Sequence, residues 1–395
     1  MDKIKLAAIS AFGLEAIVKR ELTDLGYENI VTDNGWMYID GSIHDICKMN
    51  INLRCADRVM LVMGQFEALS FEELFDKTFE LPWENWITKN GKFTVKGRSV
   101  KSKLYSTPDC QRMVKKAISK KLCEYYDVDW MPEDGAEFTI LVTIHKDIAT
   151  ISIDTTGARE GLFKRGYREK SMTAPLKETM AAALVKLSYW NKDRVLYDPM
   201  CGSGTIAIEA ALIGRNIAPG INRSFASMEW PLVKEEYWKN ARIEARKNID
   251  FNSEIKIYAS DVSEKAIRIA EENAIEAGVD DCIEFFVKDV NHIEKTMCPY
   301  GVLITNPPYG ERIGDEEQLA KIHKKLGTVF GRDRTWSIYV ITSSNNFEKE
   351  FGRKADRKRK LFNGDMRVDY YQFFGERYPA RPDSKSVNET AGPEV

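Results

Sequence analysis

The stretch Asp198-Pro199-Met200-Cys201-Gly202-Ser203-Gly204-Thr205 decides how the second half of the chain folds. It follows the run 195–198, which predicts a strand, and it opens the run 205–212, which predicts a helix. Small residues at such a strand-to-helix turn let the backbone approach a ligand closely. In sheets of alternating strands and helices, ligands bind at the carboxyl ends of the strands. This turn is therefore a candidate ligand loop.

The sequence around this loop predicts an α/β fold with a doubly wound sheet between residues 174 and 379. Further strand-like runs occupy residues 255–261, 283–289, 301–305 and 337–342. Helical patterns occupy residues 264–277 and 318–330. Such alternation is typical of parallel strands joined by helices. The pair Asn363-Gly364, between the runs 358–362 and 368–374, predicts a closing antiparallel hairpin.

Two small α+β units are predicted before this domain, over residues 1–65 and 66–156. The first has strand patterns at 4–9 and 36–39 and a helical pattern at 14–25. The second has helical patterns at 71–79 and 112–125, and strand patterns at 93–97, 138–144 and 148–153. Residues 157–173 form a connector rich in Gly and Arg, and residues 380–395 a polar tail that we expect to be loose.

Bulk composition narrows the function classes. The chain has 395 residues, 43% of them hydrophobic, which is enough for two or three cores. The formal net charge of -2 leaves no basic field over the whole protein, so any nucleic-acid binding must use local patches. Seven scattered cysteines without a C-x-x-C pair, and four histidines, predict neither a metal site nor a disulfide framework. Without a membrane-length apolar run, we expect a soluble, cytoplasmic protein.

The glycine loop suits a nucleoside ligand that carries no phosphate groups. It lacks both the G-x-G-x-x-G pattern and the Gly-Lys pair of phosphate loops. Asp198, Asp261 and Asp289 end three successive predicted strands; the second could accept hydrogen bonds from ribose hydroxyls, the third from an adenine amine. The full candidate cofactor set is Asp198, Met200, Cys201, Gly202, Ser203, Gly204, Thr205, Asp261, Val262, Asp289, Val290 and Asn306. The alternative is that these are ordinary strand-ending turns.

A second loop, Thr305-Asn306-Pro307-Pro308-Tyr309-Gly310, follows the predicted strand 301–305. Prolines fix the backbone here, so the Asn306 side-chain oxygen and the Pro307 carbonyl could act as paired acceptors for an exocyclic amine. Accepting both N–H groups aims the nitrogen lone pair at a methyl donor and stabilises the developing positive charge. A flipped base could stack on Tyr309. The candidate catalytic residues are Asn306, Pro307, Pro308 and Tyr309; the alternative is a plain strand-to-loop stop.

Local basic patches could hold nucleic acid through its phosphates. The alternative is a solvated helix face. The candidate residues are Lys96, Arg98, Lys101, Lys103, Arg112, Lys115, Lys116, Lys120 and Lys121 in the second unit, with Arg165 and Arg168 in the connector.

These motifs resemble a known family. The runs 198–205 and 305–310 are similar to motifs I and IV of class I amino-methyltransferases. The connector runs 161–168 and 174–178 resemble the junction in THUMP-domain RNA methyltransferases, above all the RlmL/YpsC-like group, which methylates guanine N2 in 23S ribosomal RNA. The resemblance covers about residues 1–378. It implies a ferredoxin-like unit, a THUMP RNA-binding unit and a Rossmann-like domain that uses S-adenosylmethionine.

Other functions remain open at this point. A DNA adenine-N6 methylase shares every catalytic motif, and members of this group are often labelled as such. A transfer-RNA guanine-N2 methyltransferase has the same domain plan. A non-catalytic RNA-binding assembly factor could retain the fold, although both intact loops argue against it. The expected partner is RNA, either 23S ribosomal RNA or a large-subunit assembly intermediate.

Overall fold

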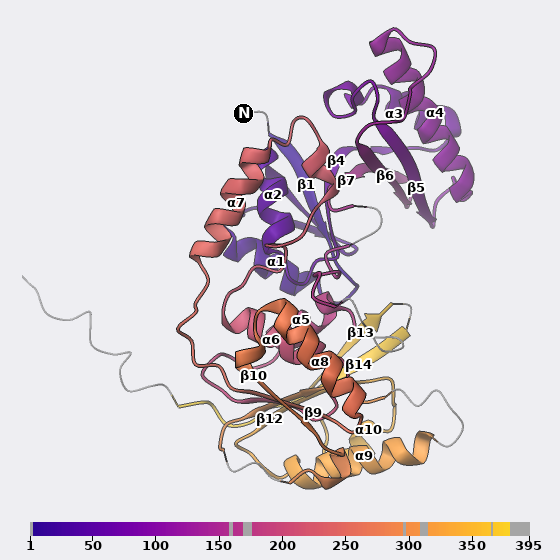
Figure 1. Ribbon diagram of the computed structural model, residues 1–395. Coiled ribbons are helices and arrows are strands. Elements are labelled where there is room, and N and C mark those ends of the chain that lie inside the picture. Colours follow the sequence, from indigo (N-terminus) through magenta and orange to yellow (C-terminus); the bar gives the residue numbers. More distant parts are fainter. Residues whose placement is uncertain are drawn as a thin grey trace, which may run out of the picture.

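The computed structural model describes residues 3–157, 161–168, 176–294, 298–308, 315–364 and 366–379. The strands of this described part form two seven-stranded sheets, one in each half of the chain (Figure 1). No described helix is long and apolar enough to span a bilayer. All seven cysteines are free thiols.

The first sheet has the strand order β2-β3-β1-β4-β7-β6-β5. Its strands are β1 (Ile4–Ile9), β2 (Val31–Asp33), β3 (Trp36–Gly41), β4 (Arg58–Glu67), β5 (Lys92–Val100), β6 (Glu137–His145) and β7 (Ile148–Asp154). Its helices are α1 (Glu15–Asp24), α2 (Ile43–Asn52), α3 (Phe71–Phe79) and α4 (Thr107–Tyr126), with a 3-10 turn at η1 (Trp83–Asn85). Every strand and helix expected in this half is present, within a few residues at its ends.

The two N-terminal units share this sheet. Strand β4 runs through the expected boundary at residue 65 and pairs with β1 on one side and β7 on the other. Residues 58–62 of β4 pair with β1 and residues 60–67 pair with β7, with a register shift between Val62 and Gly64. A bulge bends a strand and increases its twist without ending it. The sequence signals two units, and the structure joins them through one strand.

The second sheet has the order β10-β9-β8-β11-β12-β14-β13. Its strands are β8 (Leu196–Asp198), β9 (Ile257–Asp261), β10 (Ile283–Val287), β11 (Val302–Thr305), β12 (Ser337–Thr342), β13 (Arg357–Asn363) and β14 (Met366–Phe373). Strands β8 to β12 are parallel, and the expected hairpin β13–β14 adds to β12 in antiparallel fashion. The switch from β8 to β11 at the centre is where such sheets bind ligands.

Both faces of this sheet are covered, as expected for a doubly wound fold. Alternate strand residues face different cores: Leu196 packs with Ile208 of one cluster, whereas Tyr197 belongs to the cluster that holds Phe330. The helices are α5 (Glu178–Lys186), α6 (Thr205–Gly214), α7 (Glu235–Lys247), α8 (Glu264–Ala277), α9 (Asp315–Phe330) and α10 (Phe347–Phe351), with 3-10 turns at η2 (Ala226–Glu229), η3 (Asp280–Cys282) and η4 (Val290–His292).

An excursion of the second domain docks on the first sheet. Helix α7 packs against α2 (Figure 1). Trp230 stacks on Phe138 of β6 at 4.9 Å between ring centroids, and its indole N–H donates to the Glu137 carbonyl. Nearby, a Cβ at Gly220 would lie 2.5 Å from the Asn50 carbonyl oxygen, so only glycine allows this approach. The two halves are therefore held by a packed interface.

Candidate active site

The glycine loop lies between β8 and α6, as the sequence predicts. Gly204 begins α6 with a φ of 80°, and a Cβ there would lie 3.0 Å from the Ala270 Cβ of α8. Gly202 has a φ of 53°, and no described atom lies within 4 Å of where its Cβ would be. One side of the loop thus packs against α8, while the other side faces open space.

The side chains of this loop point into the protein. Cys201, Ser203 and Thr205 are all buried, and Asn273 of α8 donates a hydrogen bond to the Ser203 carbonyl. Met200 is half-buried beside the core. The loop therefore offers a ligand mainly its backbone, which explains why its residues are small.

Asp198 connects the two predicted loops. Its carboxylate is buried and accepts hydrogen bonds from the Thr305 hydroxyl at 2.7 Å and from the Met200 amide at 3.2 Å. Burial raises the pKa of Asp198 to about 7, and the two hydrogen bonds only partly oppose that rise. Its place beneath both loops makes it a positioning residue.

Asp261 ends β9, and Asp289 lies two residues after the end of the neighbouring parallel strand β10. Asp261 accepts hydrogen bonds from the Gly202 amide at 3.0 Å and the Ser263 amide at 2.9 Å, which ties the end of β9 to the glycine loop. Asp289 caps η4 and accepts from the backbone and side-chain nitrogens of Asn291. Both carboxylates are partly exposed, as groups that bind a ligand must be.

The two valines that follow these acids differ in placement. Val262 is 69% exposed, so an apolar side chain lies at the open end of β9. The Val290 side chain is 5% exposed and packs in a core cluster. If Val290 contacts a cofactor, as the sequence predicts, it does so through its main chain, because its side chain is buried.

Asn306 follows β11, which is hydrogen-bonded between β8 and β12. Its side-chain oxygen is buried and, within the described part of the chain, accepts no hydrogen bond. Pro307 is buried and Pro308 is exposed. Tyr309 lies outside the described residues. A buried acceptor left without a donor costs about 1–3 kcal/mol, so such atoms usually await a ligand or water.

The two loops open at one edge of the sheet. Strands β8 and β11 are adjacent and parallel, so the loops after them leave in the same direction. The Thr305–Asp198–Met200 hydrogen bonds link the loops directly. The structure therefore brings Gly202 and Asn306 to a common edge, as their order in the sequence predicts.

These residues fit a nucleoside-like cofactor. The bare backbone at Gly202 leaves room for close approach, and the Asp261 carboxylate is fixed beside it. The exposed Val262 adds an apolar contact at the same strand end. Backbone amides, a carboxylate for hydroxyl groups and an apolar face are what a ribose and its base require.

The basic residues of the second unit form two exposed surfaces: one lies on α4, and the other, which includes Arg98, lies on the opposite face of the sheet at β5. Lys116, Lys120 and Lys121 of α4 extend over the rings of Phe75 and Phe79 of α3, at 5.4 to 5.9 Å from the centroids. Three basic residues of α4 also have acidic partners: Arg112 pairs with Asp109, Lys115 with Glu133 and Lys120 with Glu124. Lys96, Arg98, Lys101 and Lys103 are also exposed.

The connector arginines Arg165 and Arg168 belong to neither of these exposed surfaces. Arg165 is 6% exposed and pairs with the fully buried Glu209 of α6 at 3.2 Å. Arg168 pairs with the buried Glu178 at 2.9 Å and donates to the Thr205 hydroxyl. Their guanidinium groups hold the connector to the second domain. The expectation that they contact RNA is therefore withdrawn, because their charges are already satisfied inside the protein.

The sequence alone does not reveal which side chains pair with Asp198 and Arg165. Thr305 is adjacent to Asn306, but nothing in its sequence position shows that it donates to Asp198. Glu209 had a visible signal, because it is the one charged residue in the run 205–212. A lone carboxylate in an apolar helix predicts a buried ionic partner.

Three family models match the chain. The RlmL ferredoxin-like domain matches residues 5–60, the THUMP domain residues 68–154, and the RMKL-like methyltransferase domain residues 165–372.

Curated relatives agree with these matches. The chain is 46% identical to "Putative RNA methyltransferase YpsC" of Bacillus subtilis, over 98% of this chain and 100% of that protein. It is 32% identical to "Ribosomal RNA large subunit methyltransferase K/L" of Psychromonas ingrahamii, over 90% of this chain and 48% of that protein. The chain thus spans about half the length of the second relative.

Solved structures show the same fold. The putative methyltransferase SMU.472, complexed with SAH, is 44% identical with a TM-score of 0.89, covering 96% of this chain and 100% of that one. A predicted N6-adenine-specific DNA methylase from Listeria monocytogenes is 47% identical with a TM-score of 0.90, covering 95% of this chain and 97% of that one.

Proposed function

Because this chain belongs to the RMKL-like methyltransferase family, we propose that it transfers a methyl group from S-adenosylmethionine to the exocyclic amine of an RNA base, guanine N2 in 23S ribosomal RNA. The observation that carries the proposal is the Asn306 side-chain oxygen beside the glycine loop, which is buried and has no hydrogen-bond partner among the described residues. The THUMP match and the names of both curated relatives support RNA as the substrate.

Residues of three strand ends would hold the cofactor. The backbone of 202–204 lies against the cofactor's amino-acid portion and ribose, Asp261 accepts from the ribose hydroxyls, and Asp289 accepts from the adenine amine. Val262 contacts the adenine face. When bound, S-adenosylmethionine supplies an electrophilic methyl group on a sulfonium.

Asn306 orients the target nitrogen. Its side-chain oxygen and the Pro307 carbonyl each accept one N–H of the amine, which directs the lone pair towards the methyl donor. The same two acceptors stabilise the positive charge that develops on nitrogen. Asn306 is neutral, so the amine proton leaves to water after transfer. The base reaches this position by flipping out of its stack, with Tyr309 as the stacking face.

The choice of 23S ribosomal RNA is supported by the similarity to the large-subunit methyltransferase of Psychromonas ingrahamii. The free RNA or a large-subunit assembly intermediate would be the partner, in the cytoplasm. No metal is required by this chemistry, because a neutral amine is nucleophilic enough once its lone pair is aligned.

A transfer assay tests the proposal against its rivals. Purified protein is incubated with methyl-labelled S-adenosylmethionine and ribosomal RNA, transfer RNA or duplex DNA, and the modified nucleosides are identified by mass spectrometry. We expect N2-methylguanine in 23S ribosomal RNA. N6-methyladenine in DNA would establish the DNA methylase instead, and label in transfer RNA alone would establish the transfer-RNA enzyme. Binding to ribosomal RNA without transfer to any substrate would favour an assembly factor.

A further inference from the structure

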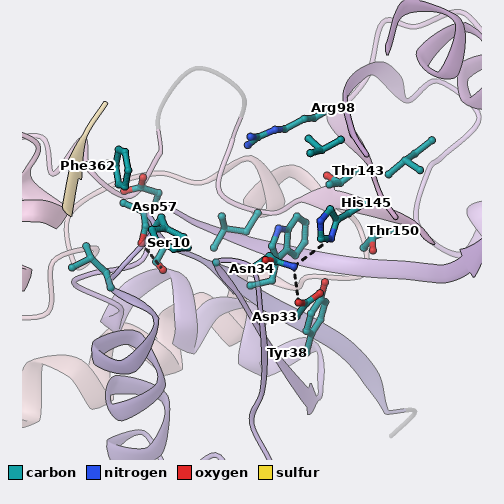
Figure 2. A pocket seen from close by; sticks show the side chains of 18 of the residues that line it. Ser10, Asp33, Asn34, Tyr38, Asp57, Arg98, Thr143, His145, Thr150 and Phe362 are labelled. Carbon is teal, nitrogen blue, oxygen red and sulfur yellow. Dashed lines mark hydrogen bonds between the residues drawn. The ribbon is translucent and has the colours of Figure 1, made fainter. Parts of the chain in front are cut away.

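The first sheet has one face covered by helices and one face that lines a cleft. Helices α1, α2 and α4 pack with the face that carries Leu6 and Val142. The opposite face carries a second apolar cluster that includes Trp36 and Tyr38. These two aromatics line a cleft of about 1030 Å³ (Figure 2).

The cleft face continues across both N-terminal units. In register, Gln65 of β4 lies opposite Thr150 of β7, Thr150 opposite Thr143 of β6, and Thr143 opposite Arg98 of β5. Residues paired in register point to the same face of a sheet. All four side chains line the cleft with Tyr38. A single platform therefore extends from the first unit to the basic strand of the second.

The floor and one wall of the cleft are aromatic. Trp36 and Tyr38 stack at 5.8 Å with an interplanar angle of 17°. Phe12 is 62% exposed and meets Phe362 of β13 edge-on at 6.0 Å. His145 lies within 3.3 Å of the Asn34 amide nitrogen, so it closes the floor between the two units (Figure 2). Trp36 and Tyr38 are only 9% and 7% exposed, so they form the base of the cleft, whereas Phe12 and the half-buried Phe362 present ring surface on which an unpaired base can stack.

The polar groups of the cleft suit a phosphate backbone. Arg98 extends over the cleft from the side opposite Phe362 (Figure 2), and Lys146 is exposed at its rim. Of the two lining carboxylates, Asp57 is paired with Lys177 at 3.5 Å, whereas Asp33 accepts a hydrogen bond from the neutral Asn34 amide and keeps its charge. Arg98 and Lys146 therefore face one carboxylate that no described cation compensates. The two cations outnumber that carboxylate and remain for an anionic ligand, and the Gln65–Thr150 pair on the floor offers hydrogen bonds to base edges.

The far end of the cleft belongs to the catalytic domain. Phe362 and Gly364 come from the β13 hairpin, and Met180 from α5. The neighbouring Glu178 pairs with Arg168, which also donates to Thr205 at the start of the cofactor-loop helix. A strand lying in the cleft would thus pass from the basic strand β5 towards the active site.

We propose that this cleft binds a short single-stranded RNA segment that flanks the target nucleotide, with its bases stacked against Phe12 and Phe362 and its phosphates on Arg98 and Lys146. The proposal rests on the proposed function for the identity of the nucleic acid. Duplex RNA does not suit the platform, because paired bases cannot present their faces to it.

Binding of a fluorescein-labelled 12-nucleotide single-stranded oligoadenylate, followed by anisotropy, tests the cleft. We expect Phe12→Ala to weaken binding by about fivefold or more, since one stacked base contributes roughly that much. Arg98→Ala should weaken binding and flatten its dependence on salt, since one phosphate contact is lost. The matched controls are Phe251→Ala, a phenylalanine 69% exposed elsewhere, and Arg332→Ala, which is also exposed. Melting temperature and the affinity for SAH should be unchanged in all four variants.

A second measurement does not depend on variants. Photo-cross-linking of the wild-type protein to a 4-thiouridine oligonucleotide should label peptides that contain Phe12, Trp36 or His145. Wild-type affinity in both cleft variants, cross-links confined to other surfaces, or equal competition by a duplex of the same length would each overturn the cleft proposal, even if the enzyme methylates RNA. Cross-links in the cleft without methyl transfer to RNA would keep the cleft and refute the proposed function.

Discussion

The proposed chemistry depends on Asn306. Its buried side-chain oxygen accepts no hydrogen bond from the described residues, so it is available to the target amine. Replacing Asn306 with alanine removes a charge-stabilising acceptor. We expect Asn306→Ala to lower kcat by about 100- to 1000-fold, the usual loss for one such group. The affinity for SAH, measured by titration calorimetry, should fall much less. A variant that keeps more than a tenth of wild-type kcat would contradict this role.

The buried carboxyl of Asp198 makes the free energy of unfolding depend on pH. Its pKa is raised by burial to about 7 from 3.8. A carboxyl with a raised folded-state pKa contributes its full stability below its unfolded pKa, near pH 4, and that contribution is lost as pH rises through about 7. Between about pH 5 and pH 8 we expect the free energy of unfolding of wild type to drop by roughly 2–3 kcal/mol more than that of Asp198→Asn.

Urea unfolding at several pH values measures this difference. The control is Asp24→Asn, which changes an exposed aspartate. If Asp198→Asn and wild type keep parallel stability profiles, the carboxyl does not titrate in this window.

At the residue scale, the sequence predicts which positions lie at the site more reliably than it predicts what each side chain contacts. Asp198, Asp261 and Asn306 all lie at the predicted edge. Whether a side chain faces the ligand or the core depends on packing that a single sequence does not display. For that reason Val290 and the two connector arginines, expected to face ligands, point inward.

At the element scale, the buried pair Arg165–Glu209 fixes the connector to α6, together with hydrogen bonds from Tyr167 to Glu209 and from Arg168 to Thr205. Removing one partner leaves a buried charge uncompensated. We expect Glu209→Ala to destabilise the protein by about 3–5 kcal/mol in chemical denaturation. Glu264→Ala, which breaks the exposed pair with Arg268, should cost less than about 1 kcal/mol. Equal losses in the two variants would contradict the structural role of the connector.

Helix α4 is the element predicted to face RNA. We expect the combined change of Lys115, Lys116, Lys120 and Lys121 to glutamine to weaken binding of ribosomal RNA and to flatten its dependence on salt, by about 0.7 in logarithmic slope for every phosphate that is no longer neutralised. A control with four exposed lysines changed elsewhere, Lys234, Lys239, Lys247 and Lys265, should bind as wild type does. Unchanged affinity and slope in the α4 variant would exclude this helix from the RNA surface.

Elements with strong periodicity are predicted well, and α8, α3 and β12 have the expected ends. Helices α2 and α7 escape prediction. Their stability comes largely from packing against each other, which is a tertiary effect. The whole of strand β4 also escapes prediction, and because it serves both units the expected boundary at residue 65 falls inside it.

At the scale of the whole molecule, Trp230 joins the catalytic domain to the first sheet through Phe138 and the Glu137 carbonyl. We expect Trp230→Ala to destabilise the protein by about 3–5 kcal/mol, as for other buried tryptophans. Because the interface is weakened, calorimetry should show the single unfolding transition split in two. Trp130→Ala, at a position 76% exposed, is the matched control. One unshifted transition in Trp230→Ala would show that the halves are coupled elsewhere.

The shared strand β4 has a consequence for how a substrate is measured. Because the first two units share one continuous hydrogen-bonded sheet, the distance between them is set by backbone geometry, and the packing of Trp230 and α7 holds the catalytic domain against that sheet. We therefore expect the enzyme to select its target nucleotide by the distance from a structural landmark in the RNA. Moving that landmark by a few nucleotides should shift the methylated position or abolish methylation.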